Sequence, residues 1–132
     1  AYLLAPLTAT ADTTVEIDGD IIGKPDDEAH AMRILKRLSG RTHRVLTGVA
    51  VRLEQRVEYA LSVSEVRFRP LEEKEIRHYL LSGEQRDKAG AYGIQGRAAL
   101  FVEHLAGDYN GVMGLPLCQT GQLLKRFGYE IL

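Results

Sequence analysis

The chain has 132 residues, of which 45% are hydrophobic and 27% charged, and seventeen Lys and Arg nearly balance eighteen Asp and Glu. This composition predicts one folded domain over residues 1–132 and excludes a disordered chain, which would combine low hydrophobicity with high net charge. No run approaches the roughly 18 to 20 apolar residues of a membrane-spanning helix, and no block of Lys and Arg marks a nucleic-acid or lipid surface, so neither partner is expected. A single cysteine, Cys118, excludes an intrachain disulfide and fits a reducing compartment, so we expect a cytoplasmic protein.

The first third of the chain predicts a strand and then a helix. Residues 7–17 are rich in Thr, Val and Ile, and the turn composition of residues 18–20 ends them. Residues 26–38 place apolar side chains at i, i+3, i+4 and i+7, with acidic residues in the first turn and basic residues in the last. Gly40 then ends the predicted helix.

The middle of the chain predicts a β-hairpin followed by a second helix. Across residues 42–69, hydrophobic residues alternate with a period of two on both sides of a short polar connection, and Pro70 ends the second arm. Residues 72–81 return to helical spacing, and Gly83 is their stop.

The last third combines loops, a strand and a closing helix. The charged, glycine-rich residues 84–97 show neither period and predict a loop. We expect a strand over 98–105, another loop over 107–114 and a helix over 116–127. Because strands and helices intermix without a repeat or linker, the sequence predicts an α/β domain with a mixed, twisted sheet flanked by helices.

Asp12 stands out as a carboxylate inside an apolar, Thr-rich strand. An unpaired buried charge is costly, so such a group is expected to be desolvated, paired or bound to a cation. Ligands of open α/β sheets bind at strand ends, which makes Asp12 a candidate base or metal ligand. The alternative is that the strand ends at Thr10 and Asp12 belongs to an Asx-turn, and the spacing favours neither interpretation.

Two further features are candidates for anion binding. Lys24 lies just ahead of a predicted helix start, where an anion could be held, although the pattern alone favours a surface lysine in a turn. Residues 83–96 bring two carboxylates, two cations, amide side chains and several glycines into one loop. This set suits a magnesium-bound phosphoanhydride, because carboxylates hold the cation while Lys or Arg neutralises phosphates. A solvated charged turn is the alternative.

The remaining polar residues predict no further site. His30, His43, His78 and His104 share no metal-ligand spacing, so each is interpreted as a surface residue or a hydrogen-bonded structural one. No serine lies in a nucleophile elbow, and no Walker-type or GxGxxG loop is present.

A series of motifs along nearly the whole chain resembles the Maf family in order and spacing. They are Ala11-Asp12-Thr13-Thr14-Val15; Gly23-Lys24-Pro25; Leu38-Ser39-Gly40-Arg41-Thr42-His43 with Thr47-Gly48-Val49; Gly83-Glu84 with Asp87-Lys88-Ala89-Gly90-Ala91-Tyr92-Gly93-Ile94-Gln95-Gly96; and Gly114-Leu115-Pro116-Leu117.

The resemblance implies an inosine-triphosphatase-like fold and a house-cleaning nucleoside triphosphate pyrophosphatase, which cuts between the α and β phosphates. By motif match, Asp12 is the catalytic proton acceptor for the attacking water, and Lys24 and Lys88 bind the substrate. Asp12, Glu84 and Asp87 match positions expected to hold a divalent cation, magnesium or manganese.

Base choice is implied by two other positions. Thr13 and Gln95 match residues tied to substrate selection, and their identities resemble the subgroup that acts on dTTP and UTP. Their donor and acceptor groups suit the carbonyl and N–H edge that thymine and uracil share. The resemblance also implies a homodimer.

One expected motif is missing. Maf proteins normally begin with a strand and a Ser-x-Ser-Pro-Arg-Arg motif whose Ser and Arg residues contact the phosphates, and no Ser-Pro-Arg occurs in this chain. The opening residues 1–6 also do not resemble a signal peptide. We therefore expect an N-terminally incomplete Maf fold, the C-terminal part of a longer protein, with little or no pyrophosphatase activity by itself.

Two functions from different classes are considered. The first is an enzyme that hydrolyses dTTP and UTP, and the second is a non-catalytic nucleotide-binding or septum-formation regulatory protein. Retention of Asp12, Lys24, Glu84 and Lys88 favours the enzyme, because binding alone does not require a base beside metal ligands.

Overall fold

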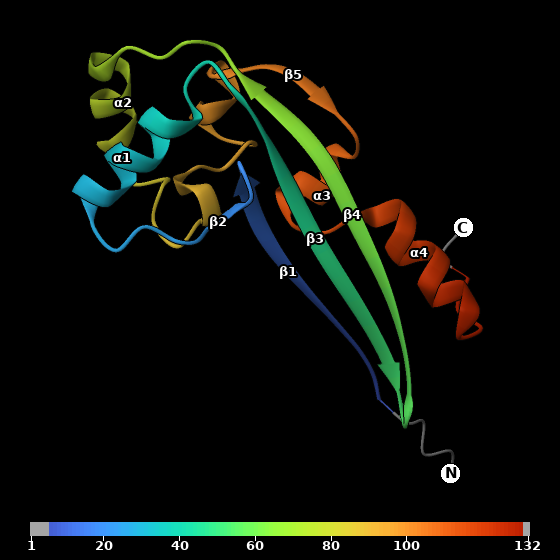
Figure 1. The fold of residues 1–132 in the computed structure, drawn as a ribbon. Coiled ribbons are helices and arrows are strands. Elements are labelled where there is room, and N and C mark those ends of the chain that lie inside the picture. The colour runs from blue at the N-terminus through green and yellow to red at the C-terminus, as the bar shows by residue number, and fades with distance from the viewer. Residues whose placement is uncertain (1–5, 131–132) are drawn as a thin grey trace.

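Five strands form one twisted sheet in the order β2-β1-β3-β4-β5 (Figure 1). This computed structural model describes residues 6–130, so the opening residues 1–5 and residues 131–132 lie outside the described part. The strands are β1 (Leu7–Ile17), β2 (Asp20–Ile22), β3 (Thr42–Leu53), β4 (Arg56–Phe68) and β5 (Val102–Ala106).

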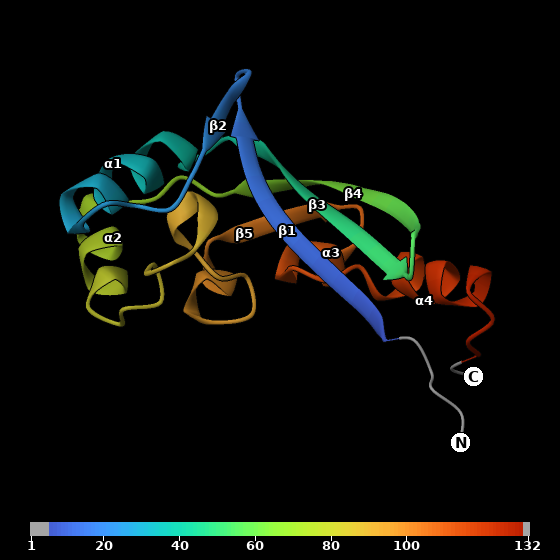
Figure 2. The ribbon, with the colours of Figure 1, turned by 90° about the horizontal axis from the view of Figure 1, so that it is seen from below.

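The helices are α1 (Glu28–Leu38), α2 (Glu73–Leu80), α3 (Tyr109–Met113) and α4 (Leu117–Arg126), with 3₁₀ turns at Ala89–Ala91 and Arg97–Leu100. α1 and α2 pack together at one end of the sheet, while α3 and α4 lie along β3 and β4 (Figure 1; Figure 2). None of the helices in residues 6–130 combines the length and apolarity that a membrane span requires.

The predicted α/β class and its flanking helices are confirmed, whereas the sheet is antiparallel rather than mixed. Every strand pairing within residues 6–130 is antiparallel. A β-α-β connection usually returns the chain parallel to its first strand. Here the hairpin of β1 and β2 reverses the chain before α1, so β3 runs antiparallel to β1.

Side-chain caps explain where α1 and α2 begin. The Asp27 carboxylate accepts a hydrogen bond from the backbone N–H of His30 at 2.7 Å, so α1 begins at Glu28, two residues after the predicted start. In α2, the Glu75 carboxylate accepts from the backbone N–H of Glu72 at 3.1 Å. The apolar faces of both helices are buried as their spacing predicts.

The last third departs from prediction in two places. The strand expected over 98–105 begins as a 3₁₀ turn, and only its second half joins β5. Ala98 in this turn and Phe101 directly after it are both buried. The loop expected before the closing helix contains α3. The Asp108 side chain caps this helix by accepting from the backbone N–H of Asn110 at 2.9 Å. Five residues are too short to show a helical period.

The alternation predicted in β4 is present, but over residues 59–63 its apolar side chains face away from the core, whereas Val66 and Phe68 nearer its end are fully buried. Tyr59, Leu61 and Val63 are 72%, 57% and 46% exposed, whereas Ser62 and Ser64 are buried. The reason is backbone packing, since glycines of α3 and of the turn before it lie directly on the two serine side chains. Along the middle of the long strands, helices cover only this one side of the sheet (Figure 2).

Residues 83–96 are anchored on β1 through Gly90. The backbone N–H of Gly90 donates to the carbonyl of Gly23 at 3.2 Å. Gly90 has φ +75°, and a Cβ at this position would lie 2.9 Å from Cγ2 of Val15. Glycine is therefore required both for the left-handed backbone and for the close approach, which holds the loop beside the segment that carries Lys24.

Gly90→Ala should lower the free energy of unfolding by about 1–3 kcal/mol, because the added methyl overlaps Val15 and the backbone is left-handed. Gly121→Ala in α4 is the matched control, since nothing lies within 4 Å of the added Cβ. That control should stabilise the chain by about 0.5–1 kcal/mol. Urea denaturation measures both changes, and a Gly90→Ala chain as stable as the parent would contradict the close packing.

Candidate active site

A cavity of about 240 Å³ opens between β1, the loop 83–96 and α3. Its lining residues come from segments far apart in the sequence and include most of those predicted to form the site. These are Asp12, Thr13, Lys24, Asp87, Lys88 and Gln95. Glu84, the remaining predicted residue, does not line this cavity.

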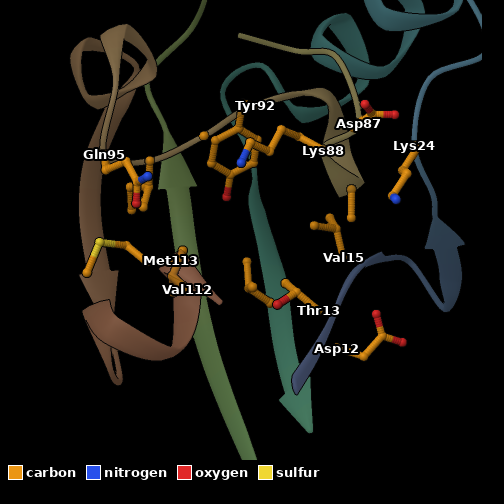
Figure 3. A pocket seen from close by; sticks show the side chains of 14 residues that line it. Asp12, Thr13, Val15, Lys24, Asp87, Lys88, Tyr92, Gln95, Val112 and Met113 are labelled. Carbon is orange, nitrogen blue, oxygen red and sulfur yellow. The ribbon is translucent and has the colours of Figure 1, made fainter. Parts of the chain in front are cut away.

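Charged and uncharged residues occupy different ends of the cavity (Figure 3). Asp12, Lys24 and Asp87 lie toward one end, and all three are exposed. Gln95 and Met113 lie at the other end. The arrangement offers ionic contacts at one end and amide and apolar contacts at the other.

The loop carries backbone strain next to Lys88, which lies between the two ends of the cavity (Figure 3). Asp87 and Ala91 have left-handed backbones, with φ values of 57° and 63°. This conformation costs an L-residue roughly 1–2 kcal/mol, and such strain concentrates at functional sites. Ala91 is completely buried, so the packing around it holds the strained conformation.

The position of Asp12 in β1 decides between the interpretations of this residue. It lies inside the strand, opposite Gly48 of β3, so the Asx-turn alternative is wrong. The desolvation expected of a strand carboxylate does not occur, because Asp12 is exposed and Gly48 leaves open space beside it. Within residues 6–130 the carboxylate has no hydrogen bond or ion pair, so it is free to bind water or a cation.

Glu84 closes the loop instead of lining the cavity. Its carboxylate accepts from the backbone N–H of Arg97, with N–O distances of 2.9 and 3.2 Å. The side chain lies so close to Gly96 that a Cβ there would overlap its carboxylate. Its predicted role as a metal ligand stays a prediction, and the contact seen here is one that holds the two ends of the loop together.

Thr13 is held by a chain of hydroxyl contacts that reaches α3. Its Oγ1 lies 3.0 Å from Oγ1 of Thr47, which in turn lies 2.6 Å from the carbonyl oxygen of Gly111. Thr47 is fully buried and directly opposite Thr13 in the β1–β3 ladder. Thr47 belongs to one of the family-like motifs, but its role was not predictable, because a sequence does not reveal the partner of a hydroxyl.

Tyr92 forms an uncharged wall of the cavity and is backed by the buried His43, and the sequence predicted neither residue as part of the site. Tyr92 lines the cavity, and its hydroxyl lies 2.6 Å from Nε2 of His43. His43 is 1% exposed and packs edge-on against Phe68, with ring centroids 5.1 Å apart. Burial lowers the pKa of His43 to about 4 and raises the pKa of Tyr92, so both are neutral at pH 7. The interpretation of His43 as a hydrogen-bonded structural residue is confirmed.

The order of the motifs agrees with a comparison against known families. The model described as "Maf-like protein" matches residues 4–127. This chain belongs to that family.

Curated relatives cover most of this Maf-like chain. A protein of Dechloromonas aromatica (strain RCB), named dTTP/UTP pyrophosphatase, is 65% identical over 92% of the chain and 60% of its own length. A protein of the same name from Aromatoleum aromaticum is 62% identical over 92% of the chain and 59% of its own length. A nucleoside triphosphate pyrophosphatase of Haemophilus ducreyi is 50% identical over 93% of the chain and 62% of its own. The chain thus spans about 60% of the length of these relatives.

Several Maf-like motifs converge on the cavity although they are far apart in sequence. The Ala-Asp-Thr motif contributes β1, and the loop 83–96 packs on that strand. The Gly114-Leu115-Pro116-Leu117 motif begins where α3 ends, and a Cβ on Gly114 would lie 3.6 Å from Oγ1 of Thr13. This motif therefore brings the backbone close to a predicted substrate-binding side chain.

The buried His43 should make stability depend on pH. Its folded pKa of about 4 lies below the ordinary value of 6.5, so this contribution to stability is complete above pH 6.5. It is lost as pH falls from 6.5 toward 4, because the unfolded chain takes up a proton that the folded chain does not, at up to about 1.4 kcal/mol per pH unit.

Urea denaturation at pH 7 and pH 5 tests this dependence. His43→Gln should reduce the loss of stability between the two pH values, whereas His104→Gln, at an exposed position, should not. The same loss in His43→Gln and in the parent would show that another group is responsible.

Proposed function

We propose that this Maf-like chain carries the substrate site of a nucleoside triphosphate pyrophosphatase that hydrolyses dTTP and UTP to the monophosphate and pyrophosphate. The observation that carries this proposal is the cavity with an ionic end and an amide-lined, partly apolar end, which correspond to the two ends of a nucleotide. The names of two relatives, which are 65% and 62% identical to this chain, support the same substrates.

Lys24 and Lys88 are assigned to the phosphates. A triphosphate carries several negative charges, and two ammonium groups in one cavity neutralise part of them. The hydrogen bond between the Gly90 N–H and the Gly23 carbonyl supports this assignment, because it joins the segments on which the two lysines lie.

Asp12 and Asp87 are the cavity carboxylates that fit a divalent cation. Mg²⁺ is usually held by one or two carboxylates while substrate phosphates complete its coordination. Such a site needs no cluster of three protein ligands, and residues 6–130 contain none. Oxygen ligands suit magnesium and manganese alike. When bound there, the cation would offset negative charge on the phosphate oxygens.

Asp12 is also the proposed general base. Its exposed carboxylate has no competing partner within residues 6–130, so it can accept a proton from the water that attacks the phosphoanhydride. Lys24 and Lys88 would stabilise the charge that develops on the leaving pyrophosphate. A carboxylate in the same cavity lining as two lysines favours hydrolysis over the non-catalytic alternative, in which a base has no use.

Thr13 and Gln95 are assigned to the base of the nucleotide. A hydroxyl and an amide supply the hydrogen-bonding groups that distinguish a pyrimidine from a purine edge. Val112 and Met113 add apolar contact on the same side of the cavity (Figure 3). The homodimer, the cytoplasmic location and a link to septum formation stay predictions.

Lys88→Gln should weaken binding of a UTP analogue that has a methylene bridge between its α and β phosphates, measured by calorimetry with Mg²⁺. The expected loss is roughly 10-fold to 100-fold, because a charge-assisted hydrogen bond to phosphate is removed. Lys74→Gln, at an exposed position on α2, is the matched control and should bind as the parent does. A parent that binds no nucleotide would refute the proposed function.

Asp12→Asn should reduce pyrophosphate release from UTP and dTTP by about 10²-fold to 10⁴-fold, because the general base is lost. The assay uses the protein at its natural length, since this chain spans about 60% of its relatives. Asp26→Asn changes an exposed carboxylate outside the cavity and should leave turnover unchanged. Unchanged turnover in Asp12→Asn would remove Asp12 from catalysis.

A further inference from the structure

The hydroxyl of Thr47 is buried, and its only proton is used in a hydrogen bond to the backbone carbonyl of Gly111. Its Oγ1 lies 2.6 Å from the carbonyl oxygen of Gly111, a distance typical of an O–H···O hydrogen bond. A carbonyl oxygen only accepts, so Thr47 must be the donor. The Gly111 carbonyl also accepts from the backbone N–H of Gly114 at 3.1 Å, which occupies its second lone pair and holds it in place.

Because Thr47 donates its only proton to Gly111, the direction of its hydrogen bond with Thr13 is fixed. Thr47 has no second proton to share, and its Oγ1 lies 3.0 Å from Oγ1 of Thr13. Two hydroxyl oxygens at this distance attract each other only with a proton between them, so Thr13 donates to Thr47. The hydroxyl of Thr13 is then left with lone pairs alone for any group inside the cavity.

The packing of the sheet and α3 holds Thr13 as the donor to Thr47 and Thr47 as the donor to Gly111. Thr13 and Thr47 are directly opposite each other in the β1–β3 ladder, and Thr47 is completely buried. Gly111 packs so closely on Ser62 that a Cβ there would overlap the serine hydroxyl, so α3 cannot shift away from the sheet without losing this contact. Water does not reach Thr47 to offer an alternative partner.

We propose that Thr47 is a positioning residue that fixes Thr13 as a hydrogen-bond acceptor and thereby selects uracil and thymine over cytosine. The inference rests on the proposed function, in which the base lies beside Thr13. Uracil and thymine carry an N3–H that donates to Thr13, whereas N3 of cytosine carries a lone pair. Two lone pairs facing each other leave both groups without a partner, which is the kind of mismatch that binding sites reject most strongly.

Thr47→Val tests the inference, because valine keeps the shape of threonine without its hydroxyl. Thr13 then regains a free proton that it can offer to N3 of cytosine. Calorimetry with Mg²⁺ compares α,β-methylene analogues of UTP and CTP on the parent, on Thr47→Val and on Thr47→Ser, which keeps the hydroxyl.

In Thr47→Val, we expect the affinity for the CTP analogue to increase. The parent and Thr47→Ser should prefer the UTP analogue by roughly tenfold or more, and Thr47→Val should bind the CTP analogue more tightly, so that the preference falls to about threefold or less. A merely structural role of Thr47 would weaken both ligands together and leave their ratio unchanged.

The outcomes separate this inference from the proposed function. If the UTP analogue binds but the UTP-to-CTP ratio is the same in Thr47→Val, or if the parent shows no preference, the positioning role is overturned while the nucleotide site stands. If no analogue binds the parent, both fail. Should Thr47→Val not fold, Thr13→Val decides, because loss of the acceptor must abolish the preference and a retained preference overturns the proposal.

Discussion

The register between β1 and β3 is the constraint on which the cavity depends. The two strands pair without interruption from Leu7 opposite Leu53 to Glu16 opposite Arg44. A slip of one residue would turn every side chain of β1 to the other face and exchange the positions of Asp12 and Thr13. Burial of Val15 and Ile17 on the core side opposes such a slip, because those side chains would become exposed.

A second constraint is the path of the loop 83–96 over this ladder. Its left-handed residues let the chain turn sharply, and Gly90 brings its backbone onto Val15. The loop also supplies Tyr92, whose hydroxyl meets the buried His43. Ionic groups therefore lie at an exposed end of the cavity, while the neutral Tyr92 side chain lines its interior and is backed by His43. In such an interior, each hydrogen bond is stronger and an unpaired polar group is costlier than in water.

Much of the fold was predictable because periodicity reports burial directly. The strand over 7–17 has the predicted bounds, and the hairpin and both early helices lie where apolar spacing places them. The antiparallel sheet, the outward side of β4 and the short α3 were not predictable, because each depends on which element packs on which. No local pattern shows that glycine backbone will cover Ser62 and Ser64 and leave Leu61 outside.

In the candidate site, too, the residue types could be predicted from the sequence, whereas their packing contacts could not. Residue patterns and the family resemblance together selected the charged residues, and six of the seven predicted residues line one cavity. Glu84 differs because its partner is a backbone N–H of Arg97, which the sequence does not specify. The roles of Thr47 and Tyr92 depend on contacts across 34 and 49 residues of chain, so only the folded structure reveals them.

Asp12 and Thr13 are neighbours in the chain, yet the pleat of β1 turns their side chains to opposite faces of the sheet. In the proposed function, one side chain serves the phosphates and the other serves the base, with a single peptide bond between them. On that proposal, a substitution at residue 13 would alter which base is accepted and leave the Asp12 carboxylate, on the other face of β1, in place. If both roles hold, substrate preference could change by point mutation at residue 13 while the residue assigned to hydrolysis is retained.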